Sequence, residues 1–68
     1  MTREQYIKRL IKIQEENFFT DTYLMKQLHL AWTTINTLRS GKSVSRATMR
    51  KIKMWVDAYE EGKIDVSN

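Results

Sequence analysis

Residues 21–42 constrain the fold most, because their apolar residues predict two short helices joined by a tight turn. At about 100° per residue, Leu24 and Leu28 share one face of the first segment. Ile35 and Leu38 share one face of the second segment in the same way. The stretch therefore predicts two helices whose apolar faces contribute to a common core.

The second of these helices, expected over residues 32–40, has an unusual polar face. Its side opposite Ile35 and Leu38 carries small uncharged hydrogen-bonding groups, namely Thr33, Asn36, Thr37 and Ser40. A solvated helix face ordinarily carries Glu and Lys, which are better helix formers than Thr, Asn or Ser. We therefore expect this row to bind a partner, and base edges in a DNA major groove offer matching hydrogen-bonding groups.

A further helix is predicted on the N-terminal side, over about residues 3–17. Thr2 and Gln5 have the spacing of a capping box, which would start this helix. Its apolar residues form one broad arc, and charged residues fill the other side. Phe18 and Phe19 are expected to end the helix and to wedge the following turn into the core.

Capping residues predict the remaining boundaries. Either Thr20 or Asp21 caps the helix that precedes the turn. His29 falls where the turn needs a left-handed backbone, in which His is enriched among non-glycine residues. Ser45 is a good N-cap for a fourth helix. The inward stripe of that helix is expected to contain Met49, Ile52, Val56 and Tyr59, with Trp55 at its edge.

These elements predict an all-α fold: one compact four-helix domain over residues 1–61 and a C-terminal tail over residues 62–68. A chain of 68 residues buries about 60% of its unfolded surface and is only marginally stable alone. A partner, either a second copy or a nucleic acid, would therefore stabilise it.

The charges are segregated along the chain. Seven basic residues and no acidic one lie between Thr22 and Val56, whereas all eight acidic residues lie outside that segment. Basic charge confined to one segment is the electrostatic pattern of a surface that faces phosphates. The alternative interpretation is a solvated cationic face, which is common for a single run of charge.

Composition argues against several classes of function. The chain has no Cys and a single His, so we expect neither a disulfide scaffold nor a metal site. Without a Gly-rich phosphate loop or clustered carboxylates, we expect no enzyme and no cofactor. No apolar run approaches the about 18 residues of a membrane span. The expected protein is soluble, cytoplasmic and associated with the nucleoid, with no membrane partner.

The segment LMKQLHLAWTTINTLRSGKSVSRATMRKI resembles the DNA-binding domain of the lambda-repressor-like, or Cro-like, helix-turn-helix family. Gly41 and Lys42 match the Gly-Lys pair that follows the family's recognition helix, and residues 48–52 match its Thr-Leu-x-Lys-Ile run. The family's buried positions correspond to Leu24, Leu28, Leu30, Ile35 and Leu38. The resemblance implies a transcriptional regulator of the phage or mobile-element repressor type that binds double-stranded DNA.

By this resemblance, the helix over residues 32–40 is the recognition helix and enters the major groove. The base-reading positions correspond to Trp32, Thr33, Asn36 and Thr37. Asn36 is the best suited of them to reading a base, because an amide can hydrogen-bond both N6 and N7 of adenine. Trp32 would pack on a thymine methyl group or a sugar, or would instead cover the flank of the core.

Phosphate contacts fix the register of a protein on DNA without reading its sequence. The residues suited to this role are Thr34, Arg39, Ser40, Lys42, Ser43 and Arg46. Arg39 has the alternative role of capping its own helix. The family usually has Gln at the position of Asp21, so a phosphate contact is not assigned to the Asp21 side chain.

One recognition helix touches only a few base pairs, so we expect a weak homodimer that forms mainly on an inverted-repeat operator. The apolar residues available for the dimer contact are Met54, Trp55, Tyr59, Ile64 and Val66. The same surface would serve another regulator protein, so a small helix-turn-helix interaction module is one alternative. An accessory DNA-binding factor for excision or plasmid transfer is another.

Overall fold

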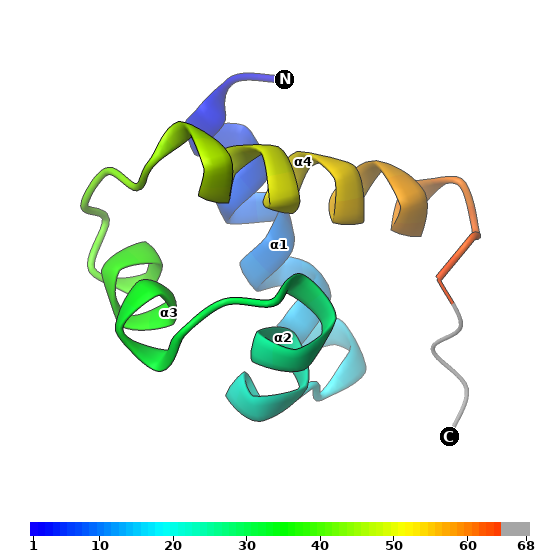
Figure 1. Ribbon diagram of the computed structural model, residues 1–68. Coiled ribbons are helices and arrows are strands. Elements are labelled where there is room, and N and C mark those ends of the chain that lie inside the picture. Colours follow the sequence, from blue (N-terminus) through cyan, green and yellow to red (C-terminus); the bar gives the residue numbers. More distant parts are fainter. Residues whose placement is uncertain (65–68) are drawn as a thin grey trace.

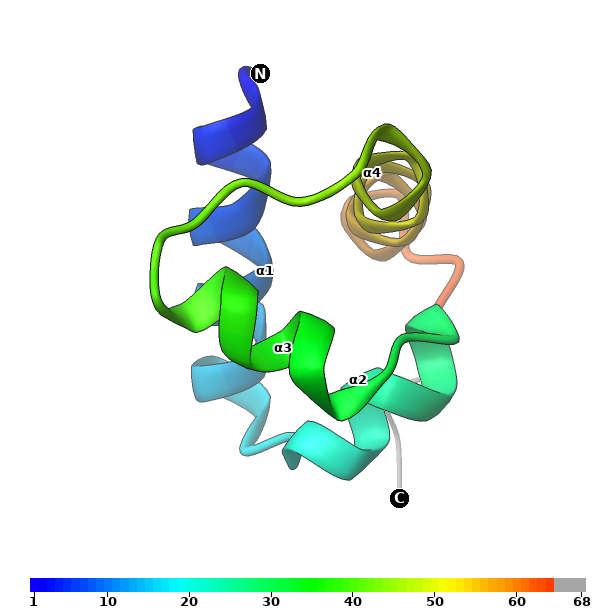
Figure 2. The ribbon, with the colours of Figure 1, turned by 60° about the vertical axis from the view of Figure 1, so that its left-hand side comes forward.

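The computed structural model describes residues 1–64. These residues form four helices and no strand: α1 (Arg3–Asn17), α2 (Asp21–Leu28), α3 (Trp32–Arg39) and α4 (Arg46–Glu60). The predicted all-α fold with four helices is confirmed. α4 packs against α1, and α2 contacts both α3 and α4 (Figure 1). Figure 2 views α4 almost end-on, with α3 in front.

None of the helices within residues 1–64 is long and apolar enough to cross a bilayer.

Side-chain caps start three of the four helices. Thr2 accepts a hydrogen bond from the Gln5 backbone N–H at 3.2 Å, and the Gln5 side chain accepts one from the Thr2 N–H at 2.8 Å. Thr20, rather than Asp21, caps α2. Ser45 caps α4. The predicted capping box and the predicted cap at Ser45 are therefore confirmed, and Asp21 is left available for another interaction.

Two helices end on a non-glycine residue in the left-handed region. His29 ends α2 with φ 54°, as predicted, and Phe18 ends α1 with φ 58°. The prediction that Phe18 and Phe19 both wedge the following turn into the core is wrong for Phe18, which is 91% exposed. Phe19 does pack on the core and stacks on Tyr23 with ring centroids 4.1 Å apart. Of the two consecutive rings, that of Phe18 therefore faces solvent and that of Phe19 contacts the core.

The core takes buried side chains from every helix. Its members are Tyr6, Leu10, Ile13, Leu24, Leu28, Leu30, Ile35, Leu38, Met49, Ile52, Trp55 and Val56. Trp55, which was predicted at the edge of the α4 stripe and as a possible dimer or partner contact, is a core residue that is only 6% exposed. The Trp55 indole N–H donates to the Gln27 side-chain oxygen at 3.3 Å. This bond satisfies the one polar group of the indole, so the whole ring can be buried.

The chain stays packed beyond the end of α4. Gly62 adopts a left-handed conformation with φ 75°, and the Lys63 N–H then donates to the Ala58 carbonyl at 2.9 Å. This turn lets Ile64 pack against the core. The first residues of the predicted tail therefore belong to the packed domain, whereas Val66 lies outside the described residues.

Candidate nucleic-acid interface

α3 has one buried face and one exposed polar face. Ile35 and Leu38 are buried, whereas Trp32, Thr33 and Asn36 are exposed. Thr34 and Thr37 are half-buried at the borders of the polar face. The predicted orientation of this helix is therefore confirmed. The helix ends at Arg39 with Ser40 as its C-cap, one residue before the predicted end.

Two shallow grooves bring many of the predicted site residues together. One groove runs along the C-terminal half of α3 and is lined by Asn36, Thr37, Arg39, Ser40 and Lys42. The other joins α3 to the start of α4 and is lined by Thr34, Thr37, Val44, Ser45 and Thr48. Ser45 and Thr48 were not predicted as site residues. The signal that could have found them is the pair of hydroxyl groups at the start of α4, from the N-cap Ser45 and from Thr48 in the first turn.

Hydrogen bonds within the protein decide which of these groups remain available. The Asn36 side chain makes no hydrogen bond within residues 1–64, and it can therefore donate and accept. The Thr37 hydroxyl donates to the Thr33 carbonyl at 2.9 Å, so it presents an acceptor outward. The Ser40 hydroxyl donates to the Thr37 carbonyl at 3.0 Å. Because a phosphate oxygen needs a donor, Ser40 would have to break this bond to contact one.

Arg39 has partners within the protein that the sequence did not predict. Its guanidinium donates to the Gln14 side-chain oxygen at 2.6 Å and forms an ion pair with Asp21. Gln14 also donates to Asp21 at 2.8 Å. The hydrogen bond from Gln14, followed by that from Arg39, lowers the pKa of the Asp21 carboxyl group. These three side chains tie the end of α3 to α1 and to the start of α2.

Two basic residues shortly after α3, Lys42 and Arg46, are not neutralised by carboxylates of the described chain. Lys42, Ser43 and Arg46 are exposed, and neither cation forms an ion pair within the part of the chain that the structure describes. Two other basic residues of α4 do have partners. Lys53 pairs with Asp57, and the Lys51 ammonium donates to the His29 carbonyl. Lys42 therefore leaves positive charge beside the uncharged polar face of α3, and Arg46 adds charge at the start of α4.

The predicted partner surface is smaller than expected. Met54 is 66% exposed and lies with Ile64 along an apolar recess of about 290 Å³ between α2 and α4, called here the Met54 recess. Buried Trp55 also lines this recess. Tyr59 is half-buried, and its hydroxyl oxygen accepts a hydrogen bond from Asn17 on α1. Among the described residues, Met54 and Ile64 are thus the predicted contacts that remain suited to a partner.

No protein-family model matches this sequence, and no curated protein or solved structure matches it either. The chemistry of the site is therefore argued from its own residues. An exposed amide and hydroxyl groups on α3 can pair with donors and acceptors of a ligand, and Lys42 and Arg46 can pair with anions.

Proposed function

We propose that this protein is a sequence-specific, double-stranded DNA-binding transcriptional regulator of the lambda-repressor-like type. α2, the turn at His29 and α3 would form its helix-turn-helix motif, with α3 as the recognition helix in the major groove. The observation that carries this proposal is the exposed Asn36 amide, which forms no side-chain hydrogen bond within residues 1–64 and lines one groove with the cation Lys42.

Base reading is assigned to the exposed face of α3. Asn36 would bond the N6 and N7 groups of one adenine. Thr37 presents an acceptor, which suits an exocyclic amino group of adenine or cytosine. Thr33 and Trp32 belong to the N-terminal half of α3, where a recognition helix approaches the bases. An exposed Trp32 suits contact with a thymine methyl group or a sugar.

Phosphate contacts are assigned to residues beside that face. Lys42 and Arg46 supply charge, and Thr34 and Ser43 supply hydroxyl groups. Arg39 would act differently from the original expectation, because its guanidinium already binds Gln14 and Asp21. It would position α3 and would prevent the Asp21 carboxylate from repelling a nearby phosphate.

Two copies would bind an inverted repeat, because one recognition helix selects too few base pairs for a genome. The Met54 recess is the surface that we propose for this pairing. Its small extent supports a weak contact that forms mainly on DNA. The same recess favours one alternative function, an interaction module that seats an apolar side chain of another regulator.

Selection of binding sites from random duplex DNA, followed by sedimentation of the protein with the selected duplex, tests the proposal. We expect an inverted repeat and two copies per duplex. Met54→Ser should lower the affinity for the inverted repeat more than the affinity for a single half-site. Recovery of no preferred sequence would contradict sequence-specific binding. A preferred single site bound by one copy would instead favour the interaction module.

A further inference from the structure

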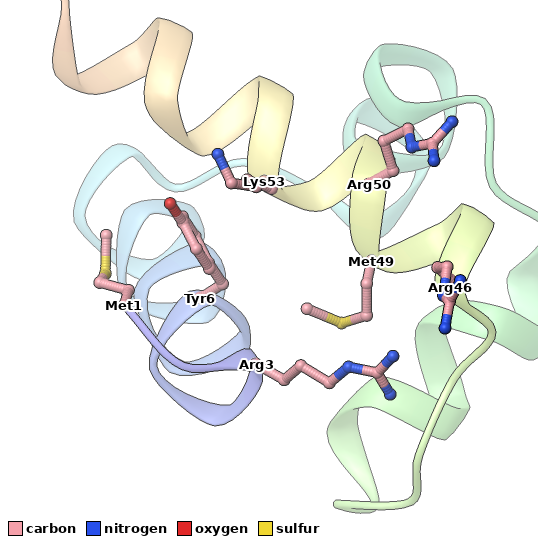
Figure 3. Close-up of a pocket in the computed structure, with 7 residues that line it drawn as sticks. All are labelled: Met1, Arg3, Tyr6, Arg46, Met49, Arg50 and Lys53. Carbon is pink, nitrogen blue, oxygen red and sulfur yellow. The ribbon is translucent and has the colours of Figure 1, made fainter.

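A second recess lies between the N-terminal parts of α1 and α4 and combines an apolar floor with a cationic edge (Figure 3). Its volume is about 300 Å³. Tyr6 from α1 and Met49 from α4 form the floor, and Arg3 reaches along the edge toward Arg46 (Figure 3). We call this feature the α1–α4 recess.

The positive charge of the α1–α4 recess comes from its arginines. Lys53 lies 5.8 Å from the centre of the Tyr6 ring, but Asp57 neutralises it at 3.1 Å. Neither Arg3 nor Arg46 forms an ion pair within residues 1–64. A bare phosphate backbone would leave the apolar floor unfilled. An apolar side chain that arrives with a carboxylate would satisfy both parts of the recess.

The opposite end of α1 carries a group with these properties. Phe18 is 91% exposed and holds a left-handed backbone, a conformation that glycine adopts with less strain. Glu15 and Glu16 are exposed in the last turn of α1, where a helix dipole disfavours negative charge, and that turn contains no basic residue. Glu16 pairs with Arg9, but Glu15 forms no ion pair within the described chain.

The ring of Phe18 is 91% exposed, and Glu15 forms no ion pair within residues 1–64, so both are free to contact a partner. A second copy of the chain offers the matching surface. We propose that this protein associates head to tail, with Phe18 of one copy in the α1–α4 recess of the next and Glu15 beside Arg3.

The two surfaces cannot meet within one molecule, because they lie at opposite ends of a helix about 22 Å long. When two copies associate in this way, the α1–α4 recess of one copy remains empty and Phe18 of the other copy remains exposed. The contact is therefore heterologous, and it adds further copies unless the geometry closes a ring. This association is independent of the proposed two-fold pairing at the Met54 recess, so its test can be made without DNA.

Sedimentation without DNA tests the proposal, with Met54→Ser in every sample so that the Met54 recess contributes nothing. At protein concentrations up to about 1 mM, the parent should grow beyond the dimer, as weak contacts of this size do. Phe18→Gly should lower the association constant at least about tenfold, because the buried phenyl ring is lost. Arg3→Glu should lower it similarly, because two carboxylates then face each other.

A mixture of the Phe18→Gly and Arg3→Glu chains provides the sharpest result. The first retains an intact recess and the second an intact Phe18, so the mixture should form a one-to-one dimer that grows no further. His29→Gly is the matched control for relief of a left-handed residue, and Lys8→Glu is the matched control for charge on α1. Both controls should associate like the parent.

The proposal is overturned if the parent stays monomeric, if Phe18→Gly associates like the parent, or if the mixture forms no dimer. It is also overturned if Arg3→Glu leaves the association constant unchanged. If the same substitution then weakens DNA binding, the α1–α4 recess belongs to the phosphate surface. Circular dichroism should show helical folding of Phe18→Gly at least as stable as the parent, because glycine removes the backbone strain.

Discussion

Arg39, the last residue of α3, forms an ion pair with Asp21, the first residue of α2. Gln14 of α1 bonds both side chains, so one polar cluster joins three helices next to the proposed DNA surface. The cluster fixes the end of α3 relative to α2. It also pairs the Asp21 carboxylate with a cation, which would reduce the repulsion of a phosphate in the proposed complex with DNA.

The Asp21 cluster predicts a specific dependence of stability on pH. The pKa of Asp21 is lowered from its ordinary 3.8, so its contribution is present above that pH and is lost as the pH falls through the lower folded-state pKa. Asp21→Asn should therefore reduce the free energy of unfolding near neutral pH, by less than about 1 kcal/mol because the pair is partly exposed. The deficit should shrink toward about pH 3. Urea denaturation of both proteins at the two pH values measures it, and an equal deficit at both would contradict this account.

The cations beside α3 predict how binding responds to salt. If each copy engages about four to six phosphates, log K should fall against log salt with a slope of about −4 to −5. Lys42→Ala and Arg46→Ala should each make the slope shallower by about 0.9 and weaken binding to all sequences alike. Lys8→Ala, on the exposed side of α1, is the matched control and should change little. A wild-type slope near zero would show that this surface does not bind phosphates.

The different environments of Trp55 and Met54 predict opposite effects of truncation. Trp55→Ala should destabilise the fold by about 3–5 kcal/mol, because it removes a buried ring and leaves a cavity in the core. Met54→Ala should change stability by less than about 0.5 kcal/mol. Thermal unfolding of both variants distinguishes the two environments. A small effect of Trp55→Ala would mean that the indole is not a core residue.

Local patterns predicted most of the fold because its helices obey local rules. The caps at Thr2 and Ser45 depend on residues three positions away, and the turn at His29 depends on one backbone conformation. The orientation of α3 follows from the spacing of Ile35 and Leu38. Each of these features is set within a few residues, so the sequence alone was sufficient.

The features that were missed depend on contacts between distant residues. Trp55 packs in the core, and its N–H is satisfied by Gln27, a residue of another helix. Arg39 is held by Gln14 and Asp21, whose positions relative to it follow from helix packing rather than from sequence spacing. Local periodicity predicted Trp55 at the edge of the inward stripe of α4. It predicted that Arg39 either contacts a phosphate or caps its own helix. Neither long-range partner could be read from such a pattern.

Asn36 provides the most direct test of the central claim, that α3 reads DNA bases. Equilibrium binding of wild type and Asn36→Ala should be measured on the selected site and on random duplex DNA at one salt concentration. We expect the substitution to cost about 1–3 kcal/mol on the selected site, with little change on random DNA and no loss of helical stability. Equal losses on both DNAs, or no loss on either, would contradict the assignment of α3 as the recognition helix.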